Sequence, residues 1–357
     1  MCAPPGQLLR GSEDLAGGSA AVTCEKARAF PASGVQRVRR RTEEVLPIAK
    51  RRSLSASQRG RTAKASPARL AEVLADYWTL TKPEVNFLIL VSTLAGFYLG
   101  SPADAGPFRF LLLFHTLMGT LLVASGTGTL NQFIERRYDA RMRRTAGRPL
   151  PAGRLAPSRA LTFGVLLSVA GGLYLGLLVN LLASFLALLT LAVYLIIYTP
   201  LKRRTPFCTL VGAFPGAMPP LIGWAAAKGS LSLGAWVLYA ILFLWQFPHF
   251  MAIAWMYRED YARAGYMMLP SGGREGRFMA WQILGFMLAL VPVSLLPTFL
   301  GHVGLIYLVG ALVLGSGFFH YGVRLALSRS NVPARRLLFA SIIYLPLVFG
   351  LMMVDKV

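Results

Sequence analysis

Three polar side chains at helical spacing follow a long apolar run in the first half of the chain. Asn131, Glu135 and Asp139 stand four residues apart from one another. At about 3.6 residues per turn such a series drifts only slowly around a helix, so all three side chains would line one face. Carboxylate and amide oxygens suit Mg²⁺, which proteins usually bind through one or two carboxylates together with substrate phosphates. The spacing therefore predicts a metal site formed by these three residues.

Basic residues accompany this series in two loops. Arg144 and Arg148 follow it directly, and Lys202 and Arg203 come from a later basic loop. Guanidinium and ammonium groups pair well with phosphate oxygens. The combination predicts a site for a diphosphate leaving group at a membrane surface. On spacing alone, a loop of mixed charge that only anchors the protein in the bilayer remains the alternative.

A second group of polar residues lies within residues 244–270. Pro248 is expected to break or kink a helix there, and irregular backbone at membrane depth is tolerated only where it lines a cavity. A single histidine is more often a packed, hydrogen-bonded residue, but one beside such a proline is a candidate for the site. The second candidate group comprises Trp245, Gln246, His249, Tyr257 and Asp260.

The elements that would position these residues are apolar and long. The chain has 357 residues, of which 55% are hydrophobic and only 15% charged. Apolar stretches of roughly 18 to 22 residues recur, long enough for a helix to cross a ~30 Å hydrocarbon core. We therefore expect an all-α polytopic membrane protein with nine transmembrane helices, at about 84–101, 108–131, 159–179, 182–200, 207–227, 233–254, 279–300, 304–324 and 337–354.

The basic residues that give the net charge of +22 are not spread evenly along the chain. Basic residues concentrate in alternate connections, at 136–159, 202–204, 258–277 and 324–336. Such alternation places the basic loops, and with them the candidate site, on the cytoplasmic side, or on the matrix side in a mitochondrion. Nucleic-acid binding would need a contiguous basic face with aromatic residues. The pattern therefore predicts the lipid bilayer, and not nucleic acid, as the partner of these charges.

Residues 1–75 differ in composition from the rest. They are rich in Gly, Ser, Ala and Arg with little hydrophobic periodicity, which predicts a basic, mostly disordered tail before a transmembrane domain at 76–357. A transit peptide is the alternative, although the acidic residues of the segment fit it poorly. The three cysteines form no pair that indicates a disulfide framework or a zinc site.

At these motifs the sequence resembles a known family. The stretch "NQFIERRYDARMRRTAGRPL" resembles the first polar motif of the UbiA-type intramembrane prenyltransferases. More narrowly, "YTPLKR", "GAMPPLIGW", "WQFPHF" and "EDYARAGYMMLP" are similar to the protohaem IX farnesyltransferases, or haem O synthases. The resemblance runs from about Thr81 to the C-terminus. It implies nine transmembrane helices around a central cavity that opens to the cytoplasmic side.

The resemblance also implies a reaction and its site. A farnesyl group would pass from farnesyl diphosphate to the 2-vinyl group of haem B with addition of water, giving haem O in haem A biosynthesis. Asn131, Glu135 and Asp139 would be the metal–diphosphate ligands, and Arg144, Arg148, Lys202 and Arg203 the diphosphate contacts. Trp245, Gln246 and His249 would contact the porphyrin, with His249 as an iron ligand or a propionate partner.

The resemblance extends to location and partners. It favours the bacterial inner membrane, with the mitochondrial inner membrane as the alternative. Haem A synthase or the assembly of a terminal oxidase would be the partner.

Two departures from the superfamily pattern stand out. Glu135 occupies a position where Asp is usual, and its longer side chain still reaches a cation. The second aspartate pair is absent, because Asp260 is followed four residues later by Ala264. One Mg²⁺ or two therefore remain possible.

Three other functions were compared. An aromatic polyprenyltransferase of quinone biosynthesis is disfavoured by "WQFPHF" and by the missing aspartate pair. A transporter would carry charges near the midplane in both halves of a repeat, whereas these charges crowd one surface. A structural assembly factor would have no use for a polar helix face turned toward a cavity.

Overall fold

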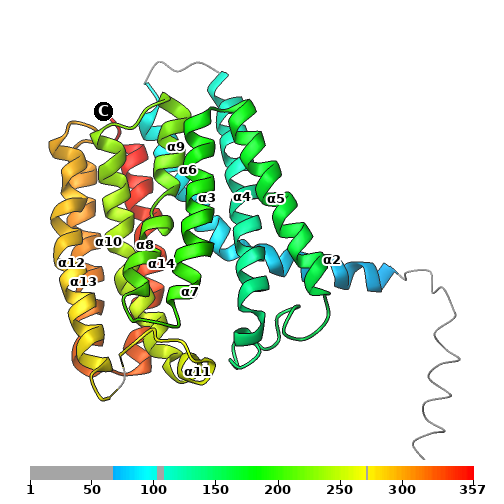
Figure 1. The fold of residues 1–357 in the computed structure, drawn as a ribbon. Coiled ribbons are helices and arrows are strands. Elements are labelled where there is room, and N and C mark those ends of the chain that lie inside the picture. The colour runs from blue at the N-terminus through cyan, green and yellow to red at the C-terminus, as the bar shows by residue number, and fades with distance from the viewer. Residues whose placement is uncertain (1–66, 103–107, 271) are drawn as a thin grey trace, which may run out of the picture. The chain divides into compact units, whose positions relative to one another are not determined.

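In the computed structural model, residues 67–357 are described except 103–107 and 271, and the regular structure of these residues is helical (Figure 1). Within this part of the chain, nine helices are long and apolar enough to cross a membrane. This confirms the expected all-α polytopic architecture. The helices are α2 (Pro67–Thr81), α3 (Pro83–Gly100), α4 (Phe108–Asp139), α5 (Pro157–Leu178), α6 (Leu181–Ala192), α7 (Thr199–Leu201), α8 (Cys208–Gly216), α9 (Pro219–Lys228), α10 (Leu233–Met256), α11 (Arg258–Ala264), α12 (Glu275–Phe299), α13 (Leu305–Ser328) and α14 (Asn331–Val354).

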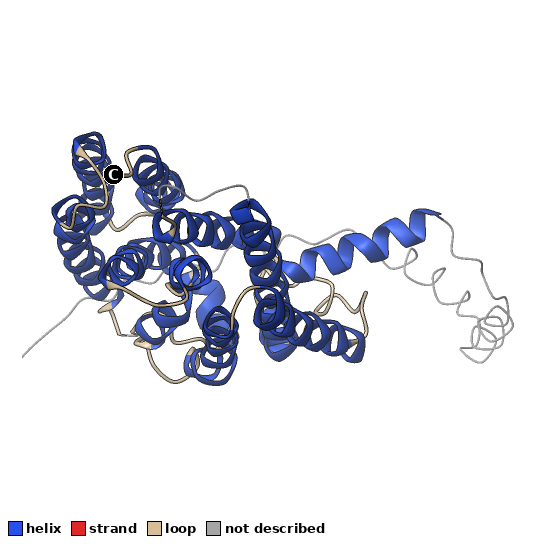
Figure 2. Ribbon diagram, turned by 90° about the horizontal axis from the view of Figure 1, so that it is seen from above, coloured by secondary structure: helices blue, strands red, loops and turns tan. Residues whose placement is uncertain are grey.

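The spanning helices pack in chain order and close on themselves (Figure 2). Each contacts its successor, and α14 returns to pack against α3. Among the contacts between helices that do not follow one another, the most extensive are those of α3 with α9 and of α10 with α14. Because α9 and α10 contact helices on several sides, the α8–α9 and α10 spans are 67% and 61% buried, whereas the α5, α12 and α13 spans are 28% buried.

The helices differ from the expected spans at three places. First, α4 continues to Asp139 rather than ending near residue 131, which keeps the whole polar series helical. Second, α10 runs unbroken through Pro248, so of the break or kink that was expected there, the break is wrong. Tight packing on several sides holds α10 helical although a proline removes one backbone hydrogen bond. Third, the fifth span is interrupted at Ala217 and Met218, between α8 and α9.

The first described helix, α2, begins at Pro67, so the expected tail boundary at residue 75 falls inside a helix. Residues 1–66 of that tail lie outside the described part of the chain. The helix is amphipathic: Leu70, Leu74 and Trp78 are exposed, whereas Leu80 is fully buried. It runs sideways across the lower half of the bundle, above the lower end of α4, and packs mainly on α4 (Figure 1). An amphipathic helix that lies crosswise to spanning helices suits the bilayer interface.

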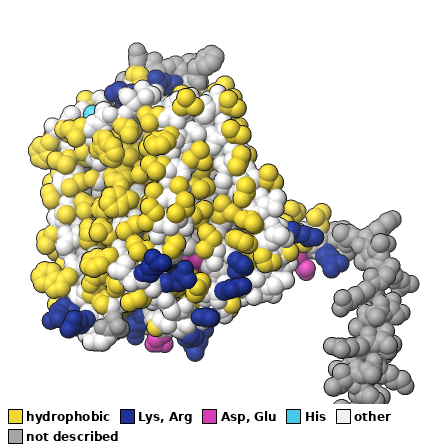
Figure 3. All heavy atoms as spheres, in the orientation of Figure 1, with side chains coloured by type: hydrophobic (Ala, Val, Ile, Leu, Met, Phe, Trp, Pro, Cys, Tyr) yellow, Lys and Arg dark blue, Asp and Glu magenta, His cyan; other side chains and the backbone are white. Residues whose placement is uncertain are grey.

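The surface is divided between apolar and basic zones. Hydrophobic side chains cover the middle of the face in Figure 3, and most Lys and Arg side chains gather toward its lower end. We call that end, at which Asp139, Lys202 and α11 lie, the basic end. The division is what a bilayer-spanning bundle with basic loops on one side requires.

The contact between α3 and α9 depends on glycine. A Cβ atom on Gly223 would lie 1.9 Å from the carbonyl oxygen of Thr93, and one on Gly96 would lie 2.1 Å from that of Pro220. Both obstacles are backbone atoms, which cannot rotate away. The two helices therefore approach closely because small residues stand at the crossing.

We predict that Gly223→Ala destabilises the bundle by about 1–3 kcal/mol, the usual cost of overpacking. Gly285→Ala is the matched control, because a Cβ there meets nothing within 4 Å and alanine favours the helix. The check is the thermal unfolding midpoint in detergent. Equal midpoints for the two variants would contradict the close crossing.

Candidate functional site

The polar series on α4 faces the interior of the bundle at the basic end. Asn131, Glu135 and Asp139 are only 2%, 7% and 1% exposed. An isolated buried carboxylate is strongly disfavoured, so each one needs a compensating partner. The structure supplies those partners from three segments that are distant in sequence.

A cation contacts each of the three side chains. The Lys82 ammonium donates to Asn131 Oδ1 at 2.9 Å. Lys202 Nζ lies 2.9 Å from Glu135 Oε1, and Arg148 Nη1 lies 2.8 Å from Asp139 Oδ2. The three contacts thus bring three basic side chains to two carboxylates, so the buried site has one basic group more than its carboxylates balance. Such an excess favours a bound anion.

Lys202 owes its position to an irregular helix. After α6, a π-helical turn (Val193–Tyr198) precedes α7, and Lys202 follows α7 directly. Its ammonium lies over the Tyr198 ring, 4.6 Å from the centroid. Burial alone would lower the pKa of Lys202, but the adjacent Glu135 carboxylate together with Tyr198 and Tyr194 raises it, and the resulting pKa is well above the usual value. Lys202 is therefore a permanent cation of the site.

Lys82 is a site residue that the sequence reasoning missed. It joins α2 to α3 with φ 55°, in the left-handed region that residues other than glycine rarely adopt. Backbone strain of this kind persists where the surroundings impose it, often at functional sites. Burial lowers the pKa of Lys82 to about 7, and the Arg148 cation adds to this effect. The available signal was a lysine at the start of a spanning helix on the basic side, in "TKPEV".

Tyr266 is a second residue that sequence reasoning did not single out. It is 7% exposed, and its hydroxyl group is buried without a hydrogen-bond partner among the described residues. Burial, together with the nearby Glu135 carboxylate, raises the pKa of Tyr266. Its ring lies 5.7 Å from that of Tyr138, centroid to centroid. The Tyr266 hydroxyl group therefore lies buried beside the Glu135 carboxylate, at the edge of the site.

Arg144 and Arg203, two of the expected diphosphate contacts, are exposed and contact other residues. Arg144 lies over the Tyr257 ring at 4.7 Å, and its backbone N–H donates to Asp260 Oδ2 at 3.2 Å. Arg203 donates to the Tyr138 hydroxyl. The structure thus brings Arg144, Tyr257 and Asp260 together as a clamp between the loop after α4 and α11. In the part of the chain described, no ion pair joins this clamp to Glu135 or Asp139.

Trp245, Gln246 and His249 lie on α10 and contact its neighbours. The indole N–H of Trp245 donates to the Ser341 carbonyl at 2.9 Å, and its ring stacks on His249 at 4.9 Å. Gln246 donates to the Ala213 carbonyl at 3.1 Å. Over the described ranges, no hydrogen bond links these three side chains to the polar series on α4.

The tautomer of His249 follows from its partner. Ser341 Oγ donates to the Leu338 carbonyl at 2.6 Å and lies 2.8 Å from His249 Nδ1. Because the hydroxyl proton is already used, Nδ1 carries the hydrogen and donates it to Ser341. The lone pair of His249 is then on Nε2. A histidine that ligates a metal is held in the same way, by a hydrogen bond from its other nitrogen.

The donor set on α4 fits a hard cation. Two carboxylates and one amide supply oxygen only, which suits Mg²⁺. Neither here nor elsewhere among the described residues do three or more His, Cys, Asp or Glu side chains form a group that could hold a metal ion, so the two carboxylates would need further oxygen donors. A metal at this site would therefore be held by Asn131, Glu135 and Asp139 together with oxygens of a bound phosphate.

Comparison with known proteins places this site in a family. The sequence pattern of the UbiA prenyltransferase family matches residues 89–343. The chain belongs to the UbiA prenyltransferase family. It is also 56% identical over 287 residues to a protein named protoheme IX farnesyltransferase from Solibacter usitatus (strain Ellin6076), covering 79% of this chain and 98% of that protein. Further curated relatives that are 40–47% identical carry the same name.

Solved structures share the fold at low sequence identity. The structure of a digeranylgeranylglyceryl phosphate synthase matches with a TM-score of 0.64 and 17% identity, over 80% of this chain and 98% of that one. A UbiA homologue from Archaeoglobus fulgidus bound to GPP and Mg²⁺ matches with a TM-score of 0.53 and 15% identity, over 78% and 99%. These matches confirm the UbiA fold of this chain.

We predict that the two lysines of the site differ in their effect on stability. Lys202→Gln leaves Glu135 buried without its cation, which typically costs about 3–5 kcal/mol. Lys82→Gln removes one of three mutually repelling cations and keeps a donor for Asn131, so it should leave stability unchanged or raise it. Thermal unfolding midpoints of the two variants test this. A larger loss for Lys82→Gln than for Lys202→Gln would refute the charge balance described above.

Proposed function

We propose that this chain transfers the farnesyl group of farnesyl diphosphate to the 2-vinyl group of haem B, with addition of water, to give haem O and diphosphate. One structural observation supports the donor half: the buried oxygen donors on α4 face more cations than their own charge requires. The names of the curated relatives support the acceptor half, because at 40–56% identity they are protoheme IX farnesyltransferases. An aromatic polyprenyltransferase or a transporter has no comparable support.

On the donor side, the cations of the site would bind the diphosphate. Lys82, Arg148 and Lys202 would exchange part of their contacts with α4 for phosphate oxygens, and they would balance the charge on the leaving group. Arg144 and Arg203 lie farther out and would guide the anion to the site. Mg²⁺, one ion or two, would be held by Asn131, Glu135 and Asp139 and would supply further positive charge to the diphosphate when bound.

The reaction needs a dry, apolar space beside the diphosphate. The bond between C1 of the farnesyl group and the diphosphate oxygen breaks, and its electron pair leaves with the diphosphate. The terminal vinyl carbon of haem B forms the new bond to C1, and water adds to the other vinyl carbon with loss of a proton. The rings of Tyr194, Tyr198 and Tyr266 lie close to Lys202 or Glu135. They would keep water from C1 until the vinyl group reacts.

On the acceptor side, His249 would bind the haem. Its Nε2 carries the free lone pair, and Ser341 and the Trp245 ring fix the orientation of the imidazole. This makes His249 a ligand for the haem iron, with Trp245 and Gln246 holding α10 in place. Tyr257 and Asp260 would act through the loop clamp rather than by touching the porphyrin.

The site would open on the cytoplasmic side of a bacterial inner membrane, where the basic loops are expected. In a mitochondrion the same side would be the matrix. Association with haem A synthase or with terminal oxidase assembly stays a prediction.

Product analysis is the primary test. The purified chain, given haem B, farnesyl diphosphate and Mg²⁺, should produce a haem heavier by one farnesyl and one hydroxyl group, with the oxygen labelled when the reaction is run in H₂¹⁸O. EDTA should stop the reaction and added Mg²⁺ should restore it. Prenylated 4-hydroxybenzoate with unaltered haem would select the aromatic polyprenyltransferase, and turnover that is insensitive to EDTA would exclude the metal site.

Two substitutions should separate the donor and acceptor halves. Asp139→Asn is expected to abolish turnover and leave the haem absorption spectrum unchanged, because it weakens only the metal–diphosphate site. His249→Ala is expected to shift that spectrum, because it removes the proposed iron ligand. Loss of haem from Asp139→Asn would contradict the role of Asp139 in the metal–diphosphate site. A normal spectrum and normal turnover of His249→Ala would contradict the role of His249 as the iron ligand.

A further inference from the structure

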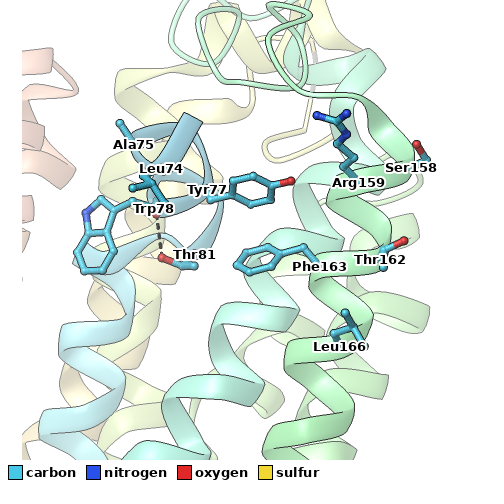
Figure 4. A pocket seen from close by; sticks show the side chains of 10 residues that line it. All are labelled: Leu74, Ala75, Tyr77, Trp78, Thr81, Ser158, Arg159, Thr162, Phe163 and Leu166. Carbon is cyan, nitrogen blue, oxygen red and sulfur yellow. Dashed lines mark hydrogen bonds between the residues drawn. The ribbon is translucent and has the colours of Figure 1, made fainter. Parts of the chain in front are cut away.

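A groove separate from the charged site lies between α2 and the start of α5 (Figure 4). Its volume is about 990 Å³, enough for part of a lipid molecule. Tyr77 and Phe163 extend toward each other across the space between the two helices, with ring centroids 4.9 Å apart. The lining comprises Leu74, Ala75, Tyr77, Trp78 and Thr81 of α2 with Ser158, Arg159, Thr162, Phe163 and Leu166 of α5.

The floor and the outer walls of the groove are apolar and open. Leu74 is 59% exposed and Leu166 62%. Further along α5, Val169 and Leu173 are also exposed on the surface that would face lipid. An acyl chain in the groove would therefore be continuous with the hydrocarbon of the bilayer. Trp78, exposed beside it, is a residue type that concentrates at the membrane–water interface.

The rim at the basic end is built for an anion. The Arg159 guanidinium stands at this rim (Figure 4), and it makes no ion pair or hydrogen bond with any residue the structure describes. The N-terminus of α5 lies at the same place, and its N-cap residue, Ala156, has no side chain that could accept from the first N–H groups. An uncapped helix N-terminus beside a free arginine offers two independent interactions to a phosphate.

We propose that this groove binds one anionic phospholipid, with its phosphate at Arg159 and the first turn of α5 and one acyl chain between α2 and α5. The charge of the rim selects an anionic headgroup, and the apolar floor selects a chain. An isoprenoid diphosphate shares this chemistry, but the lining of the groove includes none of the polar residues on α4 and none of the three cations that contact them. The groove therefore belongs to a structural lipid and not to the substrate.

The bound lipid would hold α2 in place. The other side of α2 is tied to α4, because Gln132 Nε2 donates to the carbonyl oxygens of Thr79 and Leu80 at 3.2 and 3.0 Å. A lipid wedged between α2 and α5 completes the fixation from the open side. It should stabilise the folded protein whether or not substrate is present, because ligands that bind only the folded state raise its stability.

Native mass spectrometry of the full chain is the test. The protein is exchanged into detergent with equal amounts of phosphatidylglycerol and phosphatidylcholine of the same acyl chains. Wild type should retain one phosphatidylglycerol in preference to phosphatidylcholine. Arg159→Gln should lower that preference about fivefold, the contribution of one basic residue to binding an anionic lipid. Trp78→Ala should reduce retention of both lipids.

Matched controls lie on α12, outside the groove. Arg277 is exposed like Arg159, and Trp281 is 74% exposed against 65% for Trp78. Arg277→Gln and Trp281→Ala should retain the lipid as wild type does, and phosphatidylglycerol should raise the unfolding midpoint of wild type more than that of Arg159→Gln.

Two results would overturn the proposal. One is equal retention of phosphatidylglycerol by Arg159→Gln and Arg277→Gln, which would make the bound lipid non-specific. The other is displacement of the lipid by farnesyl diphosphate in wild type but not in Arg159→Gln, which would make the groove an entrance for the substrate. Because lipid retention is measured without turnover, either result is independent of the proposed reaction.

Discussion

The structure at the basic end depends on the burial of two carboxylates on one helix. Glu135 and Asp139 lie where water cannot solvate them, so each requires a cation within hydrogen-bond distance. Those cations come from the loop after α4 and from the segment after α7, and Lys82, from the junction of α2 and α3, joins them at Asn131. The charge balance of the site therefore fixes the relative positions of three connecting segments. The same contacts bring one more basic side chain than the carboxylates balance, so the requirement for stability would also create the proposed affinity for an anion.

The parts of the fold that the sequence predicted are those with local causes. Apolar length determines where helices span the membrane, and a spacing of four determines that Asn131, Glu135 and Asp139 share a face. That Lys202 and Arg148 lie near them could be predicted, because charge and topology place those residues on the same side of the membrane. The role of Lys82 could not be predicted, because it depends on a left-handed backbone angle and on a contact across 49 residues.

The remaining departures come from long-range packing. Pro248 was expected to break or kink α10, and the break is wrong because neighbouring helices surround that helix and keep it continuous. Arg144 follows the polar series by only a few residues, but the Tyr257 ring and Asp260 hold it outside the buried site. Neither outcome follows from local sequence, because in each case the deciding partner lies in another element. The π-helical turn before α7 is a further example, since its extra residue per turn changes the direction in which Tyr194, Tyr198 and then Lys202 project.

The position of α2 connects the bilayer surface to the charged site. One side of its last turn lines the groove at Trp78 and Thr81, and the carbonyl groups of Thr79 and Leu80 accept from Gln132 on α4. Lys82 follows immediately, in a backbone conformation that only a rigid junction maintains. A short amphipathic helix would fray at an interface if it were held from one side alone, because helices of this length are marginally stable without packing. The contacts of α2 with α4, and the contact of Tyr77 with Phe163 on the groove side, therefore support the junction that directs the Lys82 ammonium at Asn131. The proposed lipid would add to this support from the bilayer side.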